Sequence, residues 1–432
     1  MIMNKKIKVI LVGAGNRANV YASVSLKNPE LFEVVGIVDP DPIRNKLMSE
    51  RYNVPEENRF PYVDDLIKRE KFADAVINGT LDDIHVETSI PVLKHGYDLL
   101  LEKPFAVNAE EANKLLAVAN EYGRKVYICH VLRYTPFYSS IKKHIMNGEI
   151  GKIISAELCE HVNYHHMAVS YVRGKWRSEK LCAAPMLLAK SCHDIDLLAW
   201  MLSETKPTQV TSFGGDFQFG TDRKPEGAGT RCLVDCPYVE SCNFSAYNNY
   251  VKNPRWKQYV WKAIEGSDDQ SIENVAESLK TYNNYGKCVW DFERDGNVDH
   301  QSVMISFESG ATATFQMIGG AARSERNIHI VGTKGEIKGT FEDSKYILRK
   351  IAPETSAGYV DTLIDLKITG DMTGEKGGHG GGDAVLAIEF IEAISGSEPS
   401  FRATTLEDSI ISHSIVFAAE KSRKSGGAVQ KL

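Results

Sequence analysis

The chain opens with an apolar run that leads into a glycine-rich turn, Lys8-Val9-Ile10-Leu11-Val12-Gly13-Ala14-Gly15-Asn16-Arg17-Ala18. The β-branched and aliphatic residues of 8–12 predict a buried strand, and a helical pattern begins at Asn16. A second apolar run, over 34–38, ends at Asp39. This order of strand, glycine turn, helix, strand and acid is typical of a dinucleotide-binding unit.

The small residues of the turn predict how a dinucleotide would lie on it. Gly13 and Gly15 allow a tight turn and a close approach of the backbone to a pyrophosphate. The helix that starts at Asn16 and Arg17 offers amide donors to the same group. We therefore expect these four residues to contact the cofactor.

The acid at the end of the second strand predicts which dinucleotide binds. A carboxylate at Asp39 can accept hydrogen bonds from both ribose hydroxyls, and it repels the 2′-phosphate of NADP. Arg44 lies close enough in sequence to weaken this discrimination. The expected cofactor is NAD, with NADP the less favoured alternative.

Strands and helices continue to alternate up to about residue 130. Apolar runs at 73–78, 98–102 and 125–129 are separated by helical stretches such as 109–122. Near-continuous apolar strands between helices are typical of a parallel sheet covered on both faces. The sequence therefore predicts an α/β domain over 1–130, a Rossmann fold with a doubly wound parallel sheet that binds NAD.

From residue 131 the pattern changes to that of an α+β domain. Residues 301–351 form short alternating runs that are separated by Ser309-Gly310 and Lys334-Gly335, which is a hairpin signature. We expect a large, mostly antiparallel, open sheet with one face free for substrate or another subunit. Residues 131–432 are assigned to substrate binding and oligomerisation, with an insertion at about 220–290.

Helices and one flexible loop complete this second domain. A strand is predicted to begin at 153–158, and helices are predicted over 187–202, 383–394 and 406–422. The glycine-rich stretch 374–383 is either a lid or a plain linker.

Composition limits the classes of function. The chain has 432 residues, 43% of them hydrophobic, and a net charge of −6, which fits two globular domains and argues against a nucleic-acid surface. No apolar run is long enough to span a bilayer. We expect a cytoplasmic protein without nucleic-acid or membrane partners, whose cysteines are reduced thiols or metal ligands.

A pentapeptide at the end of the strand predicted over 98–102 carries the candidate chemistry. It reads Leu101-Glu102-Lys103-Pro104-Phe105. Cofactors bind beyond the carboxyl ends of the strands in such sheets, so Lys103 would lie where the reactive ring of the dinucleotide lies. The alternative is a solvated lysine at a strand end.

Together these features resemble the Gfo/Idh/MocA family of sugar and inositol oxidoreductases over essentially the full length of the chain. The resemblance rests on the Gly13 loop, Asp39, Asn78-Gly79-Thr80 with His85, Glu102-Lys103-Pro104, Arg133-Tyr134, and the helix that bears His193 and Asp196. It implies that Thr80, His85, Glu102, Lys103 and Arg133 contact the cofactor. It also implies dimers or tetramers of identical chains.

The chemistry that the resemblance implies is hydride transfer from a ring hydroxyl carbon of a sugar or glycoside to the nicotinamide. Lys103 would hydrogen-bond the reacting hydroxyl, and His193 would accept its proton. Pro104 is expected to fix the turn, with a cis peptide bond as one way to do so.

The helix predicted over 187–202 departs from the family pattern. Lys190, His193 and Asp194 fall on one face, as the wall of an active site would require, although a charged exposed face is the alternative. Relatives carry an aspartate where this chain has Ala189. Either Lys190 takes over the polar role next to His193, or a carboxylate comes from elsewhere.

The departure opens a second interpretation within the family. Some relatives of similar sequence cleave glycosides by oxidation, elimination, water addition and re-reduction, so that NAD is regenerated. A third possibility is a non-catalytic regulator that binds NAD and a sugar. Residues that could line the sugar site are His165, His166, Arg173, Trp176 and Asp194. Each of the first four could instead lie in a surface loop, and His165-His166 could bind a metal.

Four cysteines mark the insertion. Cys232, Cys236 and Cys242 are grouped, and Cys288 follows in a region without clear periodicity. Four thiols in a reduced compartment suggest a structural zinc site that staples a segment with little core of its own. An iron–sulfur cluster and unliganded buried thiols are the alternatives.

Overall fold

The first domain is a Rossmann fold, as the alternating sequence pattern predicts. The computed structural model describes residues 6–368, 370, 372 and 378–432. Six parallel strands run in the order β3-β2-β1-β4-β5-β6. They are β1 (Ile7–Val12), β2 (Phe32–Val38), β3 (Arg59–Phe60), β4 (Ala75–Asn78), β5 (Asp98–Leu101) and β6 (Val126–Ile128). Their carboxyl ends form one edge, which is where ligands bind in this fold.

Helices cover both faces of this sheet. They are α1 (Asn16–Ala22), α2 (Val24–Lys27), α3 (Pro42–Tyr52), α4 (Val63–Leu66), α5 (His85–Lys94) and α6 (Ala109–Glu121). Strand residues alternate between two buried clusters: Val9 and Leu11 pack on one face, Ile10 and Val12 on the other. Two-sided burial explains why the strands read as continuous apolar runs.

The second domain is built on a nine-stranded, mostly antiparallel sheet. Its order is β14-β13-β12-β11-β7-β10-β9-β8-β15, and only β7 and β10 pair in parallel. The strands are β7 (Ile153–Asn163), β8 (Pro207–Gly215), β9 (His300–Phe307), β10 (Thr312–Ala321), β11 (Glu325–Gly332), β12 (Gly335–Thr340), β13 (Lys345–Ile351), β14 (Tyr359–Asp365) and β15 (Gln430–Lys431). The two predicted hairpins are β9–β10 and β11–β12.

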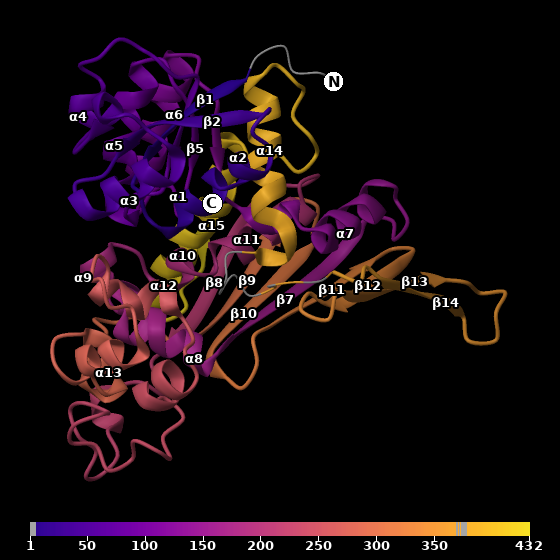
Figure 1. Cartoon of the computed structure of the whole chain (residues 1–432). Helices are drawn as coiled ribbons and strands as arrows, with labels where there is room; N and C mark the ends of the chain where they lie inside the picture. Colours follow the sequence, from indigo (N-terminus) through magenta and orange to yellow (C-terminus); the bar gives the residue numbers. More distant parts are fainter. Residues whose placement is uncertain (1–5, 369, 371, 373–377) are drawn as a thin grey trace.

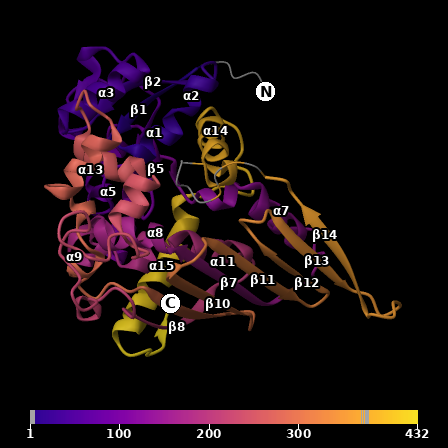
Figure 2. The same cartoon turned by 60° about the horizontal axis from the view of Figure 1, so that its bottom comes forward.

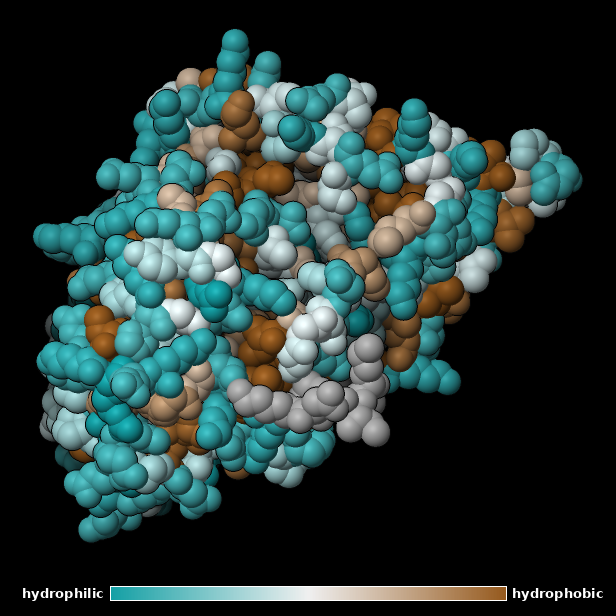
Figure 3. All heavy atoms as spheres, turned by 90° about the horizontal axis from the view of Figure 1, so that it is seen from above, coloured by the Kyte–Doolittle hydropathy of each residue, from teal (hydrophilic) through white to brown (hydrophobic). Residues whose placement is uncertain are grey.

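This sheet has one packed face and one open face. Burial alternates along β9, and Val303 and Ile305 belong to a core cluster that also contains buried residues of helices α7 (Pro136–Met146) and α11 (Cys192–Met201). Towards the far edge, β13 and β14 project from the body of the molecule (Figure 1). Hydrophobic surface is visible on that projection (Figure 3).

The chain returns to the first domain near its end. Helix α14 (Gly382–Ile394) places Leu386 and Phe390 in the same apolar cluster as strand β1, and Figure 1 shows it beside the Rossmann helices. Helix α15 (Leu406–Lys424) then crosses to β8 and α11. The described part of the glycine-rich stretch, residues 378–383, leads into α14, which packs on the first domain. Residues 374–377 lie outside the described residues.

The helix predicted over 187–202 is two helices. Helix α10 (Met186–Ala189) ends at Lys190, and α11 begins at Cys192 after Ser191. The prediction of one continuous helix is therefore wrong. At the break, the side chains of Lys190 and Ser191 bond Glu160 on β7. The apolar spacing continues across this break, so the sequence pattern does not reveal it. The alternative of an exposed charged face does not hold, since His193 and Asp194 are both buried.

The insertion contains short helices between long turns. Its longest elements are η7 (Tyr247–Lys252), α12 (Lys257–Val260) and α13 (Ile272–Lys280). It has a small core of its own that includes Tyr250, Val275 and Leu279. In Figure 2 it lies next to the Rossmann helices, and the Arg44 Nε and Glu265 Oε2 atoms, which belong to the two parts, are 3.6 Å apart.

Candidate active site

The glycine turn has the geometry that a dinucleotide cradle needs. Gly13 has φ +81°, and a Cβ at this position would lie 2.9 Å from backbone atoms of Gly79 and Thr80. Gly15 precedes α1, and the nearest atom to a Cβ there would be the Gly79 oxygen at 4.0 Å. The turn is therefore closed against the protein at Gly13 and open at Gly15, which fits a pyrophosphate at the second glycine.

Asp39 is buried at the carboxyl end of β2. Its Oδ2 accepts a hydrogen bond from the Ala14 amide at 2.8 Å, and its Oδ1 accepts one from the Asp41 amide at 2.9 Å. Each carboxylate oxygen keeps a further lone pair for a ribose hydroxyl. The Arg44 guanidinium bonds Asp41 at 2.7 Å and lies 3.8 Å from Asp39, so the acid is only partly neutralised.

Arg17 is the centre of a buried charge cluster and does not point freely from the turn. Its Nε donates to Glu102 Oε1 at 2.8 Å, and its terminal nitrogen donates to Asp383 Oδ1 at 2.6 Å. The Tyr21 hydroxyl also donates to Glu102, at 2.8 Å. Burial alone would raise the pKa of Glu102, but the Arg17 and Lys103 cations outweigh it and hold that pKa below its usual range.

Glu102 in turn fixes the loop that carries Lys103. The Lys103 amide donates to Glu102 Oε2 at 2.9 Å, and the following Lys103–Pro104 peptide bond is cis, one of the forms expected. The Pro104 carbonyl is held by the His85 ring at 2.7 Å. The predicted residues Glu102 and His85 thus support this loop from both sides.

Lys103 and His193 come together from different domains. The Lys103 ammonium donates to the Ala189 carbonyl at 2.8 Å, immediately before the break that leads to α11. Burial, then the Lys103 cation, holds the pKa of His193 well below its usual range. The His193 Nδ1 has no hydrogen-bond partner among the described residues. A neutral imidazole with a free nitrogen beside an ammonium can accept a proton from a hydroxyl bound between them.

A second histidine, which the sequence did not single out, lies beside this pair. The His379 ring centroid is 6.4 Å from that of His193, and its Nδ1 contacts Asp383 Oδ2 at 2.8 Å. Burial would raise the pKa of Asp383, but the Arg17 guanidinium and the hydrogen bond with His379 hold it at about 2. Asp383 thus links His379 to the Arg17 cluster, and no local sequence signal marks a contact between residues so far apart.

Lys190 and Asp194 belong to a separate buried network. The Lys190 ammonium bonds Glu160 on β7, and the Arg326 guanidinium bonds both Glu160 and Asp194. Burial raises the pKa of Asp194, while Arg326 and Lys190 hold that of Glu160 below its usual range. Asp194 is completely buried. The network therefore joins α11 to strands β7 and β11, and it does not include His193.

Arg133 and Thr80 are also held by the protein. Arg133 makes a two-pronged ion pair with Asp196, with contacts of 2.7 and 2.6 Å, and both side chains are buried. Thr80 follows β4, and both its amide and its hydroxyl donate to the Asn78 side chain. Arg133 therefore ties the segment that follows β6 to α11, and Thr80 shapes the loop next to Gly13.

Three of the residues expected to line a sugar site, His165, His166 and Trp176, lie around one aromatic cluster, in which Tyr259 contacts both Trp256 and Trp176. The Trp256 indole donates to His165 at 2.8 Å and stacks on His166, with centroids 4.3 Å apart. Trp176 donates to Asp82 of the first domain at 2.8 Å and so lies at the domain boundary.

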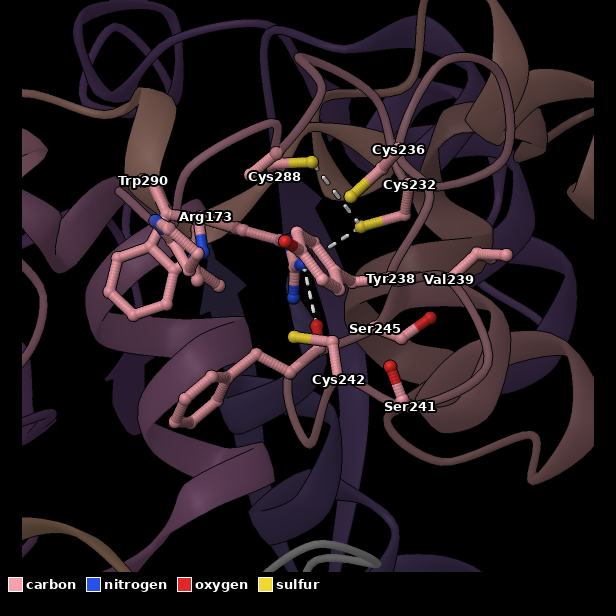
Figure 4. A pocket seen from close by; sticks show the side chains of 14 residues that line it. Arg173, Cys232, Cys236, Tyr238, Val239, Ser241, Cys242, Ser245, Cys288 and Trp290 are labelled. Atoms are coloured by element: carbon pink, nitrogen blue, oxygen red, sulfur yellow. Dashed lines mark hydrogen bonds between the residues drawn. The ribbon is translucent and has the colours of Figure 1, made fainter. Parts of the chain in front are cut away.

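Arg173, the fourth of these residues, faces the cysteines of the insertion. It lines a cavity of about 290 Å³ together with Cys232, Cys236, Cys242 and Cys288. Figure 4 shows these side chains. The Cys232 and Cys288 sulfurs are 3.9 Å apart. Within the described ranges, no three histidine, cysteine, aspartate or glutamate side chains already have the arrangement of a metal site.

The fold and the site define a nucleotide-dependent oxidoreductase of two domains. Residues 7–130 match the oxidoreductase family with an NAD-binding Rossmann fold, and residues 142–430 match the C-terminal alpha/beta domain of the same family. The chain belongs to the Gfo/Idh/MocA family of NAD-binding oxidoreductases.

Individual relatives agree with this assignment. The chain is 29% identical over 363 residues to YteT of Bacillus subtilis, covering 82% of this chain and 81% of YteT. An inositol dehydrogenase homologue from Azotobacter vinelandii, solved with NAD⁺, superposes with a TM-score of 0.71 at 16% identity, covering 100% of this chain and 98% of that one.

A further solved structure shares the same fold. The WlbA dehydrogenase of Bordetella pertussis, in complex with NADH and UDP-GlcNAcA, gives a TM-score of 0.66 at 16% identity over 100% of this chain and 99% of that one. None of the helices in the described part of the chain is both long and apolar enough to cross a membrane.

Proposed function

We propose that this protein oxidises a ring hydroxyl of a sugar or glycoside in an NAD-dependent reaction. The observation that carries the proposal is the meeting of Lys103 and His193 at the carboxyl end of β5, beyond the Gly13 turn. NAD, when bound, supplies the hydride acceptor. All other tasks fall to side chains of this protein.

Lys103 and His193 would divide the handling of the proton. The Lys103 ammonium would stabilise the oxygen as negative charge develops on it. His193 is neutral at pH 7 because burial and the Lys103 cation lower its pKa, so it can take the hydroxyl proton. Lys190, the residue expected to assist, has its ammonium on Glu160, and its role would be to hold the break before His193.

His379, which contacts the Asp383 carboxylate, would supply the polar partner for His193 that this chain lacks at Ala189. Its ring centroid is 6.4 Å from that of His193 and its Nδ1 contacts Asp383, so a proton accepted by His193 would pass to this pair. The His379–Asp383 pair would thus assist His193 as a base. Both residues lie at the end of the glycine-rich stretch. This supports the lid interpretation of that stretch for residues 378–383.

The substrate class follows from chemistry and from relatives. A buried ammonium–imidazole pair suits a secondary hydroxyl, which must lose a proton and a hydride. The WlbA structure contains a sugar nucleotide, and the Azotobacter protein is named for inositol, so polyhydroxylated rings are the first compounds to test. Trp176, His165 and His166 would border such a ring from the second domain.

The proposed cofactor contacts follow the turn and the strand ends. Gly13, Gly15, Asn16 and Asp39 would bind the pyrophosphate and ribose directly. The remaining predicted contacts, Arg17, Thr80, His85, Glu102 and Arg133, would act mainly by fixing the loops around the cofactor. Their side chains already bond to other protein groups.

The test is a panel of free sugars and glycosides incubated with the protein and NAD. NADH absorbance and release of the aglycone are followed in parallel. NADH that accumulates in proportion to the sugar consumed supports the proposal. No turnover with any polyhydroxylated ring, under conditions where NAD binds, contradicts it.

A redox-neutral glycosidase is the second candidate, and one observation favours it. The insertion contacts the cofactor side of the first domain at Arg44–Glu265, and the segment around Trp176, which precedes the insertion, contacts it at Asp82. A segment that covers the dinucleotide would slow its exchange, as a cofactor recycled within one turnover requires. In this case purified protein retains NAD through gel filtration and releases aglycone without net NADH.

A purely regulatory NAD and sugar sensor would not need the Lys103–His193 pair, which argues for catalysis. The exposed apolar residues of β13 and β14, among them Ile347, Ile351 and Leu363, suit contact with a second copy of the chain. Light scattering would show a dimer or tetramer, and Leu363→Glu would shift it toward monomer; a monomeric native protein contradicts this part.

A further inference from the structure

A cysteine-lined cavity in the insertion takes no part in the proposed oxidation. It has a volume of about 290 Å³ and is bordered by four thiols, Arg173 and aromatic side chains. Cys232 and Cys288 are buried, whereas Cys236 and Cys242 lie in turns and are partly exposed. Figure 4 shows the sulfurs of Cys232, Cys236 and Cys288 gathered on one side and Cys242 on the other.

The spacing of two of these sulfurs suits a shared metal ion. Cys232 Sγ and Cys288 Sγ are 3.9 Å apart, although they are 56 residues apart in the sequence. Two thiolates on one tetrahedral zinc, each at about 2.3 Å from it, have their sulfurs about 3.8 Å apart. A cubane iron–sulfur cluster binds each cysteine to a different iron and holds the sulfurs further apart.

Arg173 supplies an independent argument, since it is a buried cation that needs an anion. The residue is 1% exposed, and its donors reach the Lys287 and Phe244 carbonyls, the Tyr250 hydroxyl and, at 3.6 Å, the Cys232 sulfur. No carboxylate of the described residues forms an ion pair with it within 4.0 Å. A buried guanidinium without an ion pair is costly, and thiolates in this cavity would supply the negative charge that stabilises it.

We propose that Cys232, Cys236, Cys242 and Cys288 bind one zinc ion as thiolates, with Arg173 as the buried counter-cation. Each thiol loses its proton to solvent when it binds, and Zn²⁺ with four thiolates has a net charge of −2. Arg173 offsets half of that charge. Rotation of the Cys236 and Cys242 side chains within their turns would complete the tetrahedron.

This assignment explains why a segment with so little regular structure folds. The metal would join the turns at 232–242 to residue 288 and so close a long loop around the small core of Val169, Tyr250 and Leu279. A disulfide between Cys232 and Cys288 would also close the loop. It carries no charge, however, and would leave Arg173 without an anion.

The test is the metal content of the full-length protein purified without added metal. We expect about one zinc per chain by mass spectrometry of the elements, and four thiols that react with a thiol reagent only after a chelator is added. Cys236→Ser and Cys242→Ser should each lower the zinc content to less than half. The matched control Cys182→Ser, outside the cavity, should not change it.

Three results would overturn the assignment. These are less than half an equivalent of zinc with all four thiols freely reactive, iron with the visible absorbance of a cluster, or a Cys232–Cys288 disulfide found by peptide mapping. The native-protein zinc and thiol measurements decide the matter even if a serine variant fails to fold. They also do not depend on whether the protein turns over a sugar.

Discussion

The two glycines of the first turn should separate fold stability from cofactor binding. Gly13→Ala places a Cβ 2.9 Å from the Gly79 and Thr80 backbone at φ +81°. An alanine in left-handed backbone costs about 1–2 kcal/mol, and a clash with backbone atoms adds about 1–3 kcal/mol. The free energy of unfolding should therefore fall by about 2–5 kcal/mol whether or not NAD is present.

Gly15→Ala is the matched variant, because its backbone has φ −80° and its Cβ would lie 4.0 Å from the Gly79 oxygen, the nearest atom beyond its own chain neighbours. Its unfolding should match that of the native protein, while the NAD dissociation constant should rise at least about tenfold, or about 1.4 kcal/mol. Chemical denaturation and calorimetric titration with NAD measure the two effects. Unchanged NAD affinity in Gly15→Ala, or native stability in Gly13→Ala, would refute the reasoning about this turn.

Three further outcomes follow from the site. Arg133→Ala removes the partner of the buried Asp196 carboxylate, so the free energy of unfolding, measured by denaturant titration, should fall by about 3–5 kcal/mol. A loss below about 1 kcal/mol would be inconsistent with the ion pair. Because burial and the Lys103 cation lower the pKa of His193, kcat/KM should stay flat through the ordinary titration range of histidine and decline only at lower pH. Removing that cation should move the decline to higher pH, and a decline that does not move would count against the pairing. His379→Gln should lower kcat about 10-fold or more with NAD affinity kept, and an unchanged kcat would exclude a role for the His379–Asp383 pair.

The first domain was predictable because its signals are local. The Gly13 turn, Asp39 and the lysine after β5 each follow a strand end within a few residues, and parallel strands bring those ends to one edge. The pattern of two hairpins likewise predicted the open sheet of the second domain. Short-range periodicity was sufficient for these features.

The parts that the sequence did not predict depend on distant contacts. The break at Lys190 arises because its ammonium bonds Glu160 on another strand, which apolar spacing on the helix cannot register. The contact of Arg17 with Asp383 joins residues 366 positions apart. Arg173 was expected near a sugar, and only the folded insertion brings it to Cys232.

The turnover of Lys103→Met with the sugar or glycoside that the panel identifies tests most directly whether Lys103 and His193 handle the proton of the reacting hydroxyl. The change removes the ammonium but keeps a side chain of similar length, and the exposed Lys180→Met serves as the control. We expect kcat to fall about 10³-fold or more with NAD affinity within about twofold of native, whereas Lys180→Met stays at the native rate. Undiminished turnover in Lys103→Met, with NAD still bound, would contradict the central claim that Lys103 and His193 handle the proton of the reacting hydroxyl.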